Sequence, residues 1–212
     1  TAVAEYTAKD SGGKVCVIQI KPGLVKASKL DTPIFTPSTK SITGHDENVS
    51  FESMEKTLGS VLARDLRDKS LAVYNRLAAY SFKKGLILAD TKFEFGFVDG
   101  KLTLIDEAVT PDSSRLWNVA DYKEGKDQAS SNDKQFLRDW LLNEGGWTKE
   151  KQAKHIAPPL LPPEILSAAA ERYVSAYSIF TGYPPEVVRK VMGSKIMHDE
   201  DLQQKLVGTL RK

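Results

Sequence analysis

The sequence is short of the residues that build cross-linked or metal-rich proteins. Its 212 residues include one cysteine, Cys16, and three histidines. A single thiol excludes an internal disulfide and a cysteine-rich zinc site, and sparse cysteine is typical of a reducing compartment. The histidines His45, His155 and His198 are far apart in the chain. We therefore expect them to lie in loops or on the surface and to form no metal cluster.

The sequence also lacks a strong charge of one sign and a long apolar run. Its 30 Lys and Arg and 28 Asp and Glu leave a formal net charge of +2. Without a general basic field, nucleic acid is not an expected partner. No apolar stretch approaches the roughly 18–20 residues that span a bilayer, so no membrane partner is expected. Residues 1–6 do not resemble a secretory signal, and we expect a cytoplasmic protein.

What is present is typical of a globular protein with both strands and helices. Hydrophobic residues make up 41% and charged residues 27% of the chain, which is enough to build a sizeable core at this length. The β-branched run at 14–20 predicts a strand, with Cys16 in the core. Residues 21–50 are rich in Pro, Ser, Thr, Asp and Gly, which indicates a long ordered loop or a linker.

Helical spacing dominates from residue 51 to residue 84. Gly59 is a candidate break after a short first helix, and Gly85 is a candidate C-terminal cap. The leucines and valine of this segment recur at spacings of four and seven and are expected in the core: Leu58, Leu62, Leu66, Val73 and Leu77.

Two further helices and a short charged one are predicted nearer the C-terminus. Residues 131–142 carry cap residues in front and an apolar face behind them, and residues 163–180 follow a proline-rich stretch and end at Thr181-Gly182. The tail from residue 184 resembles one more short helix. Residues 108–131 are predicted to be a loop.

A predicted β-hairpin carries the residues best suited to chemistry. Residues 86–97 alternate like a strand, Asp99-Gly100 is a hairpin turn signal, and 101–107 is the return strand. Alternation places Asp90, Lys92 and Glu94 on one face. Two interpretations remain open, namely a site for magnesium and nucleotide phosphates, or a solvated sheet face with a cross-strand ion pair.

The register of this hairpin decides which acid of the return strand shares that face. A two-residue turn places Lys92 opposite Glu107 and Phe93 opposite Asp106, so Glu107 would face the other polar residues. A bulge or a three-residue loop would reverse this, because a slip of one residue moves every side chain to the other face. The pattern alone leaves both acids as candidates.

Five motifs, in order, resemble those of SAICAR synthetase (phosphoribosylaminoimidazole-succinocarboxamide synthase). Their residues are most similar to those of the single-function fungal-type form. They are PIFTPSTK (33–40), HDEN (45–48), LADTKFEFG (88–96), LIDEAVTPDSSRLW (104–117) and NDKQFLRDWL (132–141). The similarity runs from about residue 5 to residue 182. It implies an α+β fold like that of kinases and ATP-grasp enzymes, in which helices pack against an antiparallel hairpin sheet.

The resemblance implies an ATP-dependent ligase of purine (IMP) biosynthesis. Such an enzyme joins carboxyaminoimidazole ribotide (CAIR) to L-aspartate and releases SAICAR, ADP and phosphate, with ATP and Mg²⁺ as cofactors. CAIR, aspartate and ATP are then the expected partners. The alternatives are a small-molecule kinase on a related fold and a non-catalytic fragment of the ligase.

The resemblance also assigns roles to the hairpin residues. Asp90 and Lys92 correspond to catalytic residues, and Lys92, Glu94 and Asp106 to residues that bind ATP. The metal ligands are Glu94 and Asp106, a choice that favours Asp106 over the Glu107 of strict register.

The anionic substrate requires cations and hydroxyl donors, and several segments supply them. Arg115 follows two serines that can donate to phosphate oxygens, and Lys134 and Arg138 lie four residues apart near a predicted helix N-terminus, which favours anions. Asp46 and Asp133 are candidates for contacts with the ribose hydroxyls or the aminoimidazole of the substrate. The resemblance favours this substrate-binding set: Lys40, Asp46, Ser113, Ser114, Arg115, Asp133, Lys134 and Arg138.

We expect three regions along the chain. Residues 1–50 would form a strand and a substrate-binding loop, residues 51–183 the catalytic domain for ATP, magnesium and substrate, and residues 184–212 a helical tail. The family has an N-terminal lobe that roofs the nucleotide and is not represented here. We therefore expect little ligase activity from these residues alone, with that lobe as a separate or disordered segment.

Overall fold

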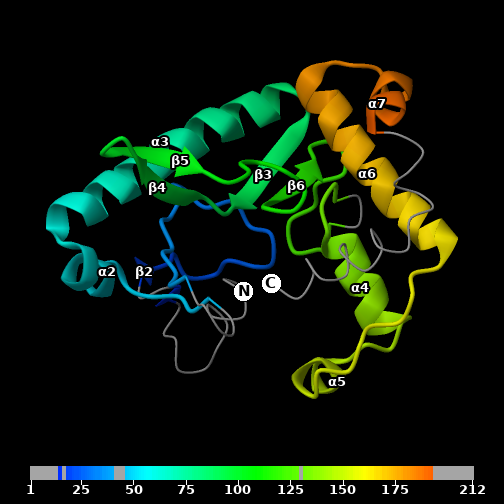
Figure 1. The fold of residues 1–212 in the computed structure, drawn as a ribbon, viewed down its shortest axis with the longest axis horizontal. Coiled ribbons are helices and arrows are strands. Elements are labelled where there is room, and N and C mark those ends of the chain that lie inside the picture. The colour runs from blue at the N-terminus through cyan, green and yellow to red at the C-terminus, as the bar shows by residue number, and fades with distance from the viewer. Residues whose placement is uncertain (1–13, 16–17, 41–45, 129–130, 193–212) are drawn as a thin grey trace. The chain divides into compact units, whose positions relative to one another are not determined.

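The computed structural model describes residues 14–15, 18–40, 46–128 and 131–192 (Figure 1). Their contacts divide them between two compact units. The first takes its described residues from Thr1–Leu77, Phe95–Leu104 and Lys123–Gln128, and the second from Ala78–Glu94, Ile105–Tyr122 and Ala129–Lys212. Helices and small antiparallel sheets occur together, so the predicted α+β class is confirmed.

The first unit begins with two very short strands. β1 (Lys14–Val15) and β2 (Ile18–Gln19) pair antiparallel with each other. The prediction of one continuous strand over 14–20 is therefore wrong. Pairing within the run satisfies backbone groups locally and leaves Val15 and Ile20 buried against apolar residues of the following loop. The core position predicted for Cys16 lies outside the described residues.

The described parts of the following segment, 21–40 and 46–50, form the predicted ordered loop. An isolated bridge joins Ser38 to Asn48. It is reinforced where the Thr39 N–H donates to the Glu47 carbonyl at 2.9 Å and the Val49 N–H donates to the Pro37 carbonyl at 2.9 Å. These bonds hold residues 37–39 beside residues 47–49.

Two consecutive helices follow, as predicted. α2 (Phe51–Leu58) is capped by Ser50, whose Oγ accepts from the Ser53 N–H at 3.1 Å, and α3 (Ser60–Lys83) begins directly after Gly59. Gly59 has φ 83° and ψ 148°, a conformation that side chains disfavour, so the glycine ends α2 and separates the two helices.

The apolar stripe predicted for these helices is only partly in the core. Leu58 is 43% exposed, whereas Ala63 is fully buried. Leu62 and the later members of the stripe are half-buried. The prediction is wrong for Leu58 because the break at Gly59 ends the helical periodicity that would have continued its face into α3.

The predicted hairpin is confirmed, but it is shorter than expected. β4 (Glu94–Val98) and β5 (Lys101–Ile105) pair antiparallel, and the turn residues Asp99 and Gly100 have φ of 49° and 72°. Positive φ at both positions is the geometry of a two-residue hairpin turn.

The predicted strand over 86–97 is wrong because the chain leaves it after Thr91. β3 (Leu86–Thr91) pairs antiparallel with β6 (Ser114–Asn118), which lies in a segment predicted as loop. The strands bury three leucines, Leu86 and Leu88 of β3 and Leu116 of β6. Burial of these leucines favours the long-range pair over one continuous hairpin strand.

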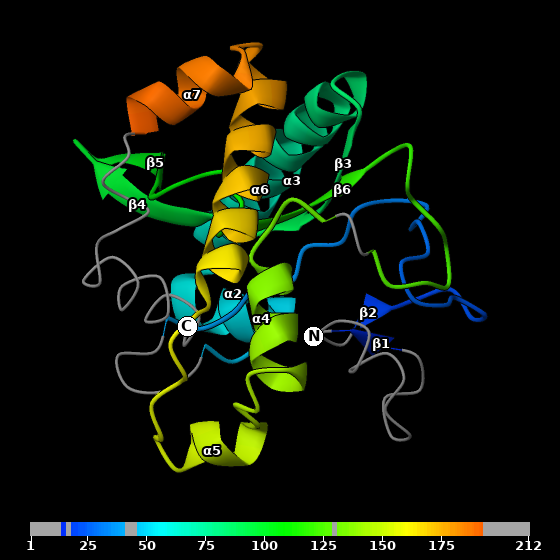
Figure 2. The ribbon, with the colours of Figure 1, turned by 90° about the vertical axis from the view of Figure 1, so that its right-hand side faces the viewer.

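Helices complete the second unit. They are α4 (Gln135–Asn143), α5 (Lys149–Ala153), α6 (Pro163–Thr181) and α7 (Pro185–Met192). α4 and α6 lie close together (Figure 2) and share a core of Leu137, Leu141, Trp147, Leu161, Leu166 and Ala169. α4 begins four residues later than predicted.

The C-terminal predictions agree with the structure over its described part. Gly182, with φ 79°, ends α6 and donates its N–H to the Ser178 carbonyl. His155 is exposed, as expected, whereas His45 and His198 lie outside the described residues. Among the residues that are described, no helix has both the length and the apolar character to cross a membrane.

Candidate functional site

A bulge in β3 places the first predicted catalytic residue. Leu88 pairs with Leu116 and Asp90 pairs with Arg115, so Ala89 is an extra residue on β3. Without the bulge, Asp90 would continue the buried face of Leu88, but its side chain is exposed. Bulges of this kind re-aim side chains and are frequent beside active sites.

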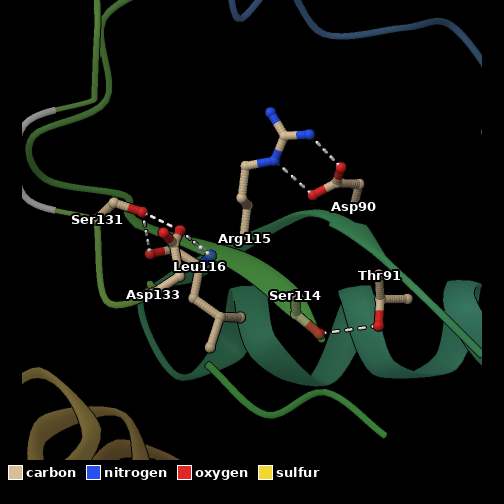
Figure 3. Close-up of polar contacts among 7 residues, drawn as sticks. All are labelled: Asp90, Thr91, Ser114, Arg115, Leu116, Ser131 and Asp133. Atoms are coloured by element: carbon tan, nitrogen blue, oxygen red, sulfur yellow. Dashed lines mark hydrogen bonds and ion pairs between the residues drawn. The ribbon is translucent and has the colours of Figure 1, made fainter. Parts of the chain in front are cut away.

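Asp90 and Arg115 form a two-point ion pair across the strands. The Arg115 Nε donates to Asp90 Oδ1 at 2.9 Å and Nη2 donates to Oδ2 at 2.5 Å. Figure 3 shows the two side chains pointing toward each other. This geometry fixes the guanidinium plane and leaves Nη1 directed away from Asp90.

The next two residues of β3 continue the contact with β6. Ser114 Oγ donates to Thr91 Oγ1 at 2.8 Å (Figure 3), and the Lys92 N–H donates to the Ser113 carbonyl at 2.9 Å. Residues 90–92 of one motif thus each contact a residue of the 113–115 segment of another motif. The two motifs that carry the predicted catalytic and substrate residues are brought together by ordinary strand pairing.

The break between β3 and β4 gives Lys92 a different partner from that of Asp90. Lys92 Nζ lies 3.2 Å from Glu94 Oε1, and the lysine side chain is about half exposed. Asp90, Lys92 and Glu94 therefore do not form the common face of one strand, because Lys92 lies in the link between two strands. This pair joins residues two positions apart in the chain, so it is not the cross-strand ion pair of the second interpretation.

Neither acid of the return strand is placed by hairpin register. β5 ends at Ile105, and Asp106 has φ 64°, in the left-handed region. The predicted alignment of Lys92 with Glu107 does not form, since β4 begins only at Glu94. Instead Asp106 and Glu107 come together, and their hydrogen bond raises the pKa of the Glu107 carboxyl.

A tight turn over residues 110–113 connects the parts of the second unit that hold the predicted site. Thr110 and Ser113 exchange hydrogen bonds, with the Thr110 N–H donating to Ser113 Oγ at 3.1 Å and the Ser113 N–H donating to Thr110 Oγ1 at 3.3 Å. The Pro111 carbonyl accepts from the Lys134 N–H at 3.3 Å, just before α4. Asp112 accepts from the Tyr173 hydroxyl of α6 at 2.8 Å.

Asp133 is an anchor between β6 and α4. The residue is 2% exposed, and its carboxylate accepts from the N–H of Gln135 at 2.7 Å, the N–H of Leu116 at 3.3 Å and the hydroxyl of Ser131 (Figure 3). Burial raises the pKa of Asp133, and these three hydrogen bonds oppose the rise. The carboxylate caps the start of α4 and ties it to the strand that holds Arg115.

The two basic residues of the predicted substrate helix lie one turn apart at the start of α4. Lys134 immediately precedes α4, and Arg138 lies in its first turn. Burial lowers the pKa of Lys134 and Arg138 lowers it further, while Asp112, Glu107 and Asp133 act in the opposite direction. The charges of Asp112, Glu107 and Asp133 therefore act on the Lys134 ammonium.

The structure distributes the predicted site residues over both compact units. Lys40 and Asp46 are exposed residues of the first-unit loop, where its first described part ends and its second begins. The remaining predicted residues belong to the second unit.

Sequence reasoning missed three contributors to this arrangement, namely Thr91, Asp112 and Tyr173. A signal for Asp112 was available, because an acid after proline in TPDSS is typical of a tight turn. No local pattern marks Tyr173, since its partner is 61 residues away.

The donor chemistry of Glu94 and Asp106 is compatible with magnesium. Mg²⁺ binds through one or two carboxylates together with substrate phosphates and keeps several waters. Asp106 and Glu107 share a hydrogen bond that raises the pKa of the Glu107 carboxyl, so two carboxyl groups lie within reach of each other there. In the described part of the chain, no three His, Cys, Asp or Glu side chains form a complete protein cage for a metal.

Comparisons with known proteins agree on one family. The model of the SAICAR synthetase family matches residues 2–154. A phosphoribosylaminoimidazole-succinocarboxamide synthase of Corynebacterium diphtheriae is 49% identical over 173 residues, which are 80% of this chain and 57% of that relative. The enzyme of the same name from Mycobacterium leprae is also 49% identical over 173 residues, with the same coverage.

Solved structures show the same similarity. A SAICAR synthase from Saccharomyces cerevisiae, complexed with SAICAR, is 38% identical with a TM-score of 0.67, over 81% of this chain and 54% of the yeast chain. The chain thus spans a little over half the length of the relatives that it matches.

Proposed function

Because the chain belongs to the SAICAR synthetase family, we propose that it carries the catalytic and substrate-binding residues of the ATP-dependent ligase that joins CAIR to L-aspartate. The observation that carries the proposal is the pairing of β3 with β6. It sets Asp90, Thr91 and Lys92 against Arg115, Ser114 and Ser113. Residues from two separate motifs thereby lie side by side, which supports a shared substrate site.

Lys92 is the proposed cation for the transferring phosphoryl group. Its side chain is half exposed, and Glu94 holds the ammonium at 3.2 Å without burying it. A lysine fixed in this way presents its charge where negative charge develops during phosphoryl transfer. Asp90 is the proposed residue that orients the attacking group, and its ion pair with Arg115 supports the proposal by fixing both side chains.

Glu94 and Asp106 are the proposed magnesium ligands, with Glu107 beside them. When bound, the metal would neutralise charge on the nucleotide phosphates. The contact between Asp106 and Glu107 supports this assignment because the protein holds two carboxylates together there.

The substrate anions are assigned to the cations around the 110–113 turn. Lys134, Arg138 and Arg115 Nη1 supply charge, and the Ser113 hydroxyl supplies a donor. Ser114 and Asp133 are buried, so we assign them to positioning β6 and α4. Lys40 and Asp46 remain proposed substrate residues of the first unit.

Several finer predictions belong to this proposal. They are the fungal-type form, the cytoplasmic location, and the division into residues 1–50, 51–183 and 184–212. The chain is similar both to bacterial enzymes and to a yeast structure, so this similarity is compatible with the bacterial and with the fungal form of the enzyme.

The test is phosphate release from ATP by the purified chain, with CAIR and aspartate added singly and together. A ligase releases phosphate above background only when both are present, and Lys92→Met should abolish that increment. ADP formation with CAIR alone would favour a kinase. A chain that neither turns over nor binds CAIR or SAICAR by calorimetry would contradict the proposal and favour a non-catalytic fragment.

A further inference from the structure

Tyr173 is a partly buried hydroxyl that the proposed reaction does not use. It lies on α6 and donates to Asp112 Oδ1 at 2.8 Å. Burial raises the pKa of Tyr173 far above its usual range, and the neighbouring Asp112 reinforces the shift. The tyrosine therefore remains protonated and acts as a constant hydrogen-bond donor.

The acceptor of this bond lies at the centre of the 110–113 turn. That turn is held on two other sides by main-chain bonds, from Lys92 to the Ser113 carbonyl and from Lys134 to the Pro111 carbonyl. Asp112 also attracts Lys134 electrostatically. A hydroxyl on α6 thus holds the side chain of a turn residue whose charge also acts on Lys134.

We propose that Tyr173 is a positioning residue for the anionic substrate, acting through Asp112 to hold the 110–113 turn and Lys134 in the arrangement that binds the ligand. The proposal rests on the function proposed above, because it concerns the same site. Tyr173 is not expected to touch the substrate or a reacting atom.

The geometry explains why the effect should reach ligand binding. Asp112 accepts from Tyr173 through Oδ1, which fixes the orientation of the carboxylate and therefore of its second oxygen. If the hydroxyl is removed, the carboxylate is free to rotate toward the Lys134 ammonium. That rotation would draw the cation away from the substrate anion and disturb the donor at Ser113.

The experiment is calorimetric titration of SAICAR into the purified chain and four variants. Tyr173→Phe removes the hydroxyl and keeps the ring. Asp112→Asn removes the acceptor charge, and a double variant combines the two. Tyr177→Phe is the matched control, because Tyr177 lies one turn further along α6 and is exposed.

We expect Tyr173→Phe to weaken SAICAR binding by about tenfold, as loss of one charge-assisted hydrogen bond predicts. Tyr177→Phe should leave the affinity unchanged. The double variant should bind no more weakly than Asp112→Asn alone, because Tyr173 works through Asp112. A purely structural role for Tyr173 would lower the stability of the fold and leave the SAICAR affinity of the folded chain unchanged.

Unchanged affinity in Tyr173→Phe, or effects that add in the double variant, would overturn the inference while leaving the proposed function intact. If Tyr173→Phe does not fold, Asp112→Asn decides: unchanged SAICAR affinity there also overturns it. If the wild-type chain does not bind SAICAR, the proposed function fails and this inference fails with it.

Discussion

Residues of similar sequence context acquire different roles from their partners. Asp90 and Asp133 are both aspartates of the recognised motifs, yet one is exposed and paired with Arg115 while the other is buried among three donors. An exposed ion pair contributes little to stability, whereas a buried carboxylate with satisfied bonds is costly to alter. The two should therefore respond very differently to substitution.

Lys92→Met separates activity from stability. We expect turnover to fall by at least about 100-fold, as loss of a preorganised charge at the phosphoryl group predicts. The free energy of unfolding should change by less than about 1 kcal/mol, because the Lys92 side chain is about half exposed in its ion pair with Glu94. Phosphate release and urea unfolding measure the two quantities, and Lys101→Met on β5 is the control. Equal losses in both variants would contradict the role of Lys92.

Asp133→Asn should change how stability depends on pH. The folded-state pKa of Asp133 lies above its ordinary value of about 3.9, so between the two values the folded protein binds more protons than the unfolded chain. The stability contribution of Asp133 is therefore full at low pH and is lost as pH rises through the folded-state pKa. Asparagine cannot ionise and removes this dependence.

The measurement is urea unfolding of both proteins from pH 4 to pH 7. The asparagine variant has a constant cost from mismatched hydrogen bonds, so the sign of the trend decides. The difference in unfolding free energy, wild type minus variant, should decrease as pH rises. A difference that stays constant or increases would show that burial does not raise this pKa.

At the scale of elements, short irregularities position the site more than regular structure does. The bulge at Ala89 turns Asp90 outward, the break after Thr91 leaves Lys92 between two strands, and the 110–113 turn joins β3, α4 and α6. Each irregularity requires a long-range partner. None of these irregularities would form if its segment were an isolated hairpin.

Gly59→Ala tests the junction between α2 and α3. Gly59 adopts φ 83° and ψ 148°, which is accessible almost only to glycine. No neighbouring atom would meet a side chain there, so any cost comes from backbone strain. We expect destabilisation of about 1–3 kcal/mol by thermal or urea unfolding, with Ser60→Ala as the control. A neutral or stabilising effect would indicate that the two helices can fuse.

At the scale of the whole molecule, the proposed site residues are divided between two compact units. Lys40 and Asp46 belong to the first, and the Asp90–Lys92 segment, the 110–113 turn and α4 belong to the second. The chain also spans little more than half of its relatives. Ligand binding is therefore the direct test of whether these residues form a binding site in this chain.

Magnesium-ATP should raise the melting temperature if the nucleotide residues form a site. A ligand at 100 times its Kd stabilises the folded state by about 2.7 kcal/mol, which corresponds to a shift of roughly 5–10 °C for a chain of this size. Differential scanning calorimetry with ATP, with and without magnesium, measures it. Glu94→Gln should reduce the magnesium-dependent part. An equal shift in that variant would exclude Glu94 as a ligand, and no shift in the wild type would favour the fragment hypothesis.

The sequence by itself determined the features that depend on neighbouring residues. The helices around Gly59, the end of α6 at Gly182 and the Asp99-Gly100 hairpin follow from local periodicity, capping and turn conformation. The order of the motifs also led to the SAICAR synthetase family, which the family model matches, whereas the roles of the site residues stay a prediction.

Only the tertiary structure decided how those residues are paired. Strand β6, the bulge at Ala89, the ion pair of Asp90 with Arg115 and the burial of Asp133 all depend on contacts between segments far apart in the chain. Alternation within one strand cannot show which second strand will bury Leu88, and that burial is what favours the pairing. The same reason hid Tyr173, whose partner is determined by packing of α6 near the 110–113 turn.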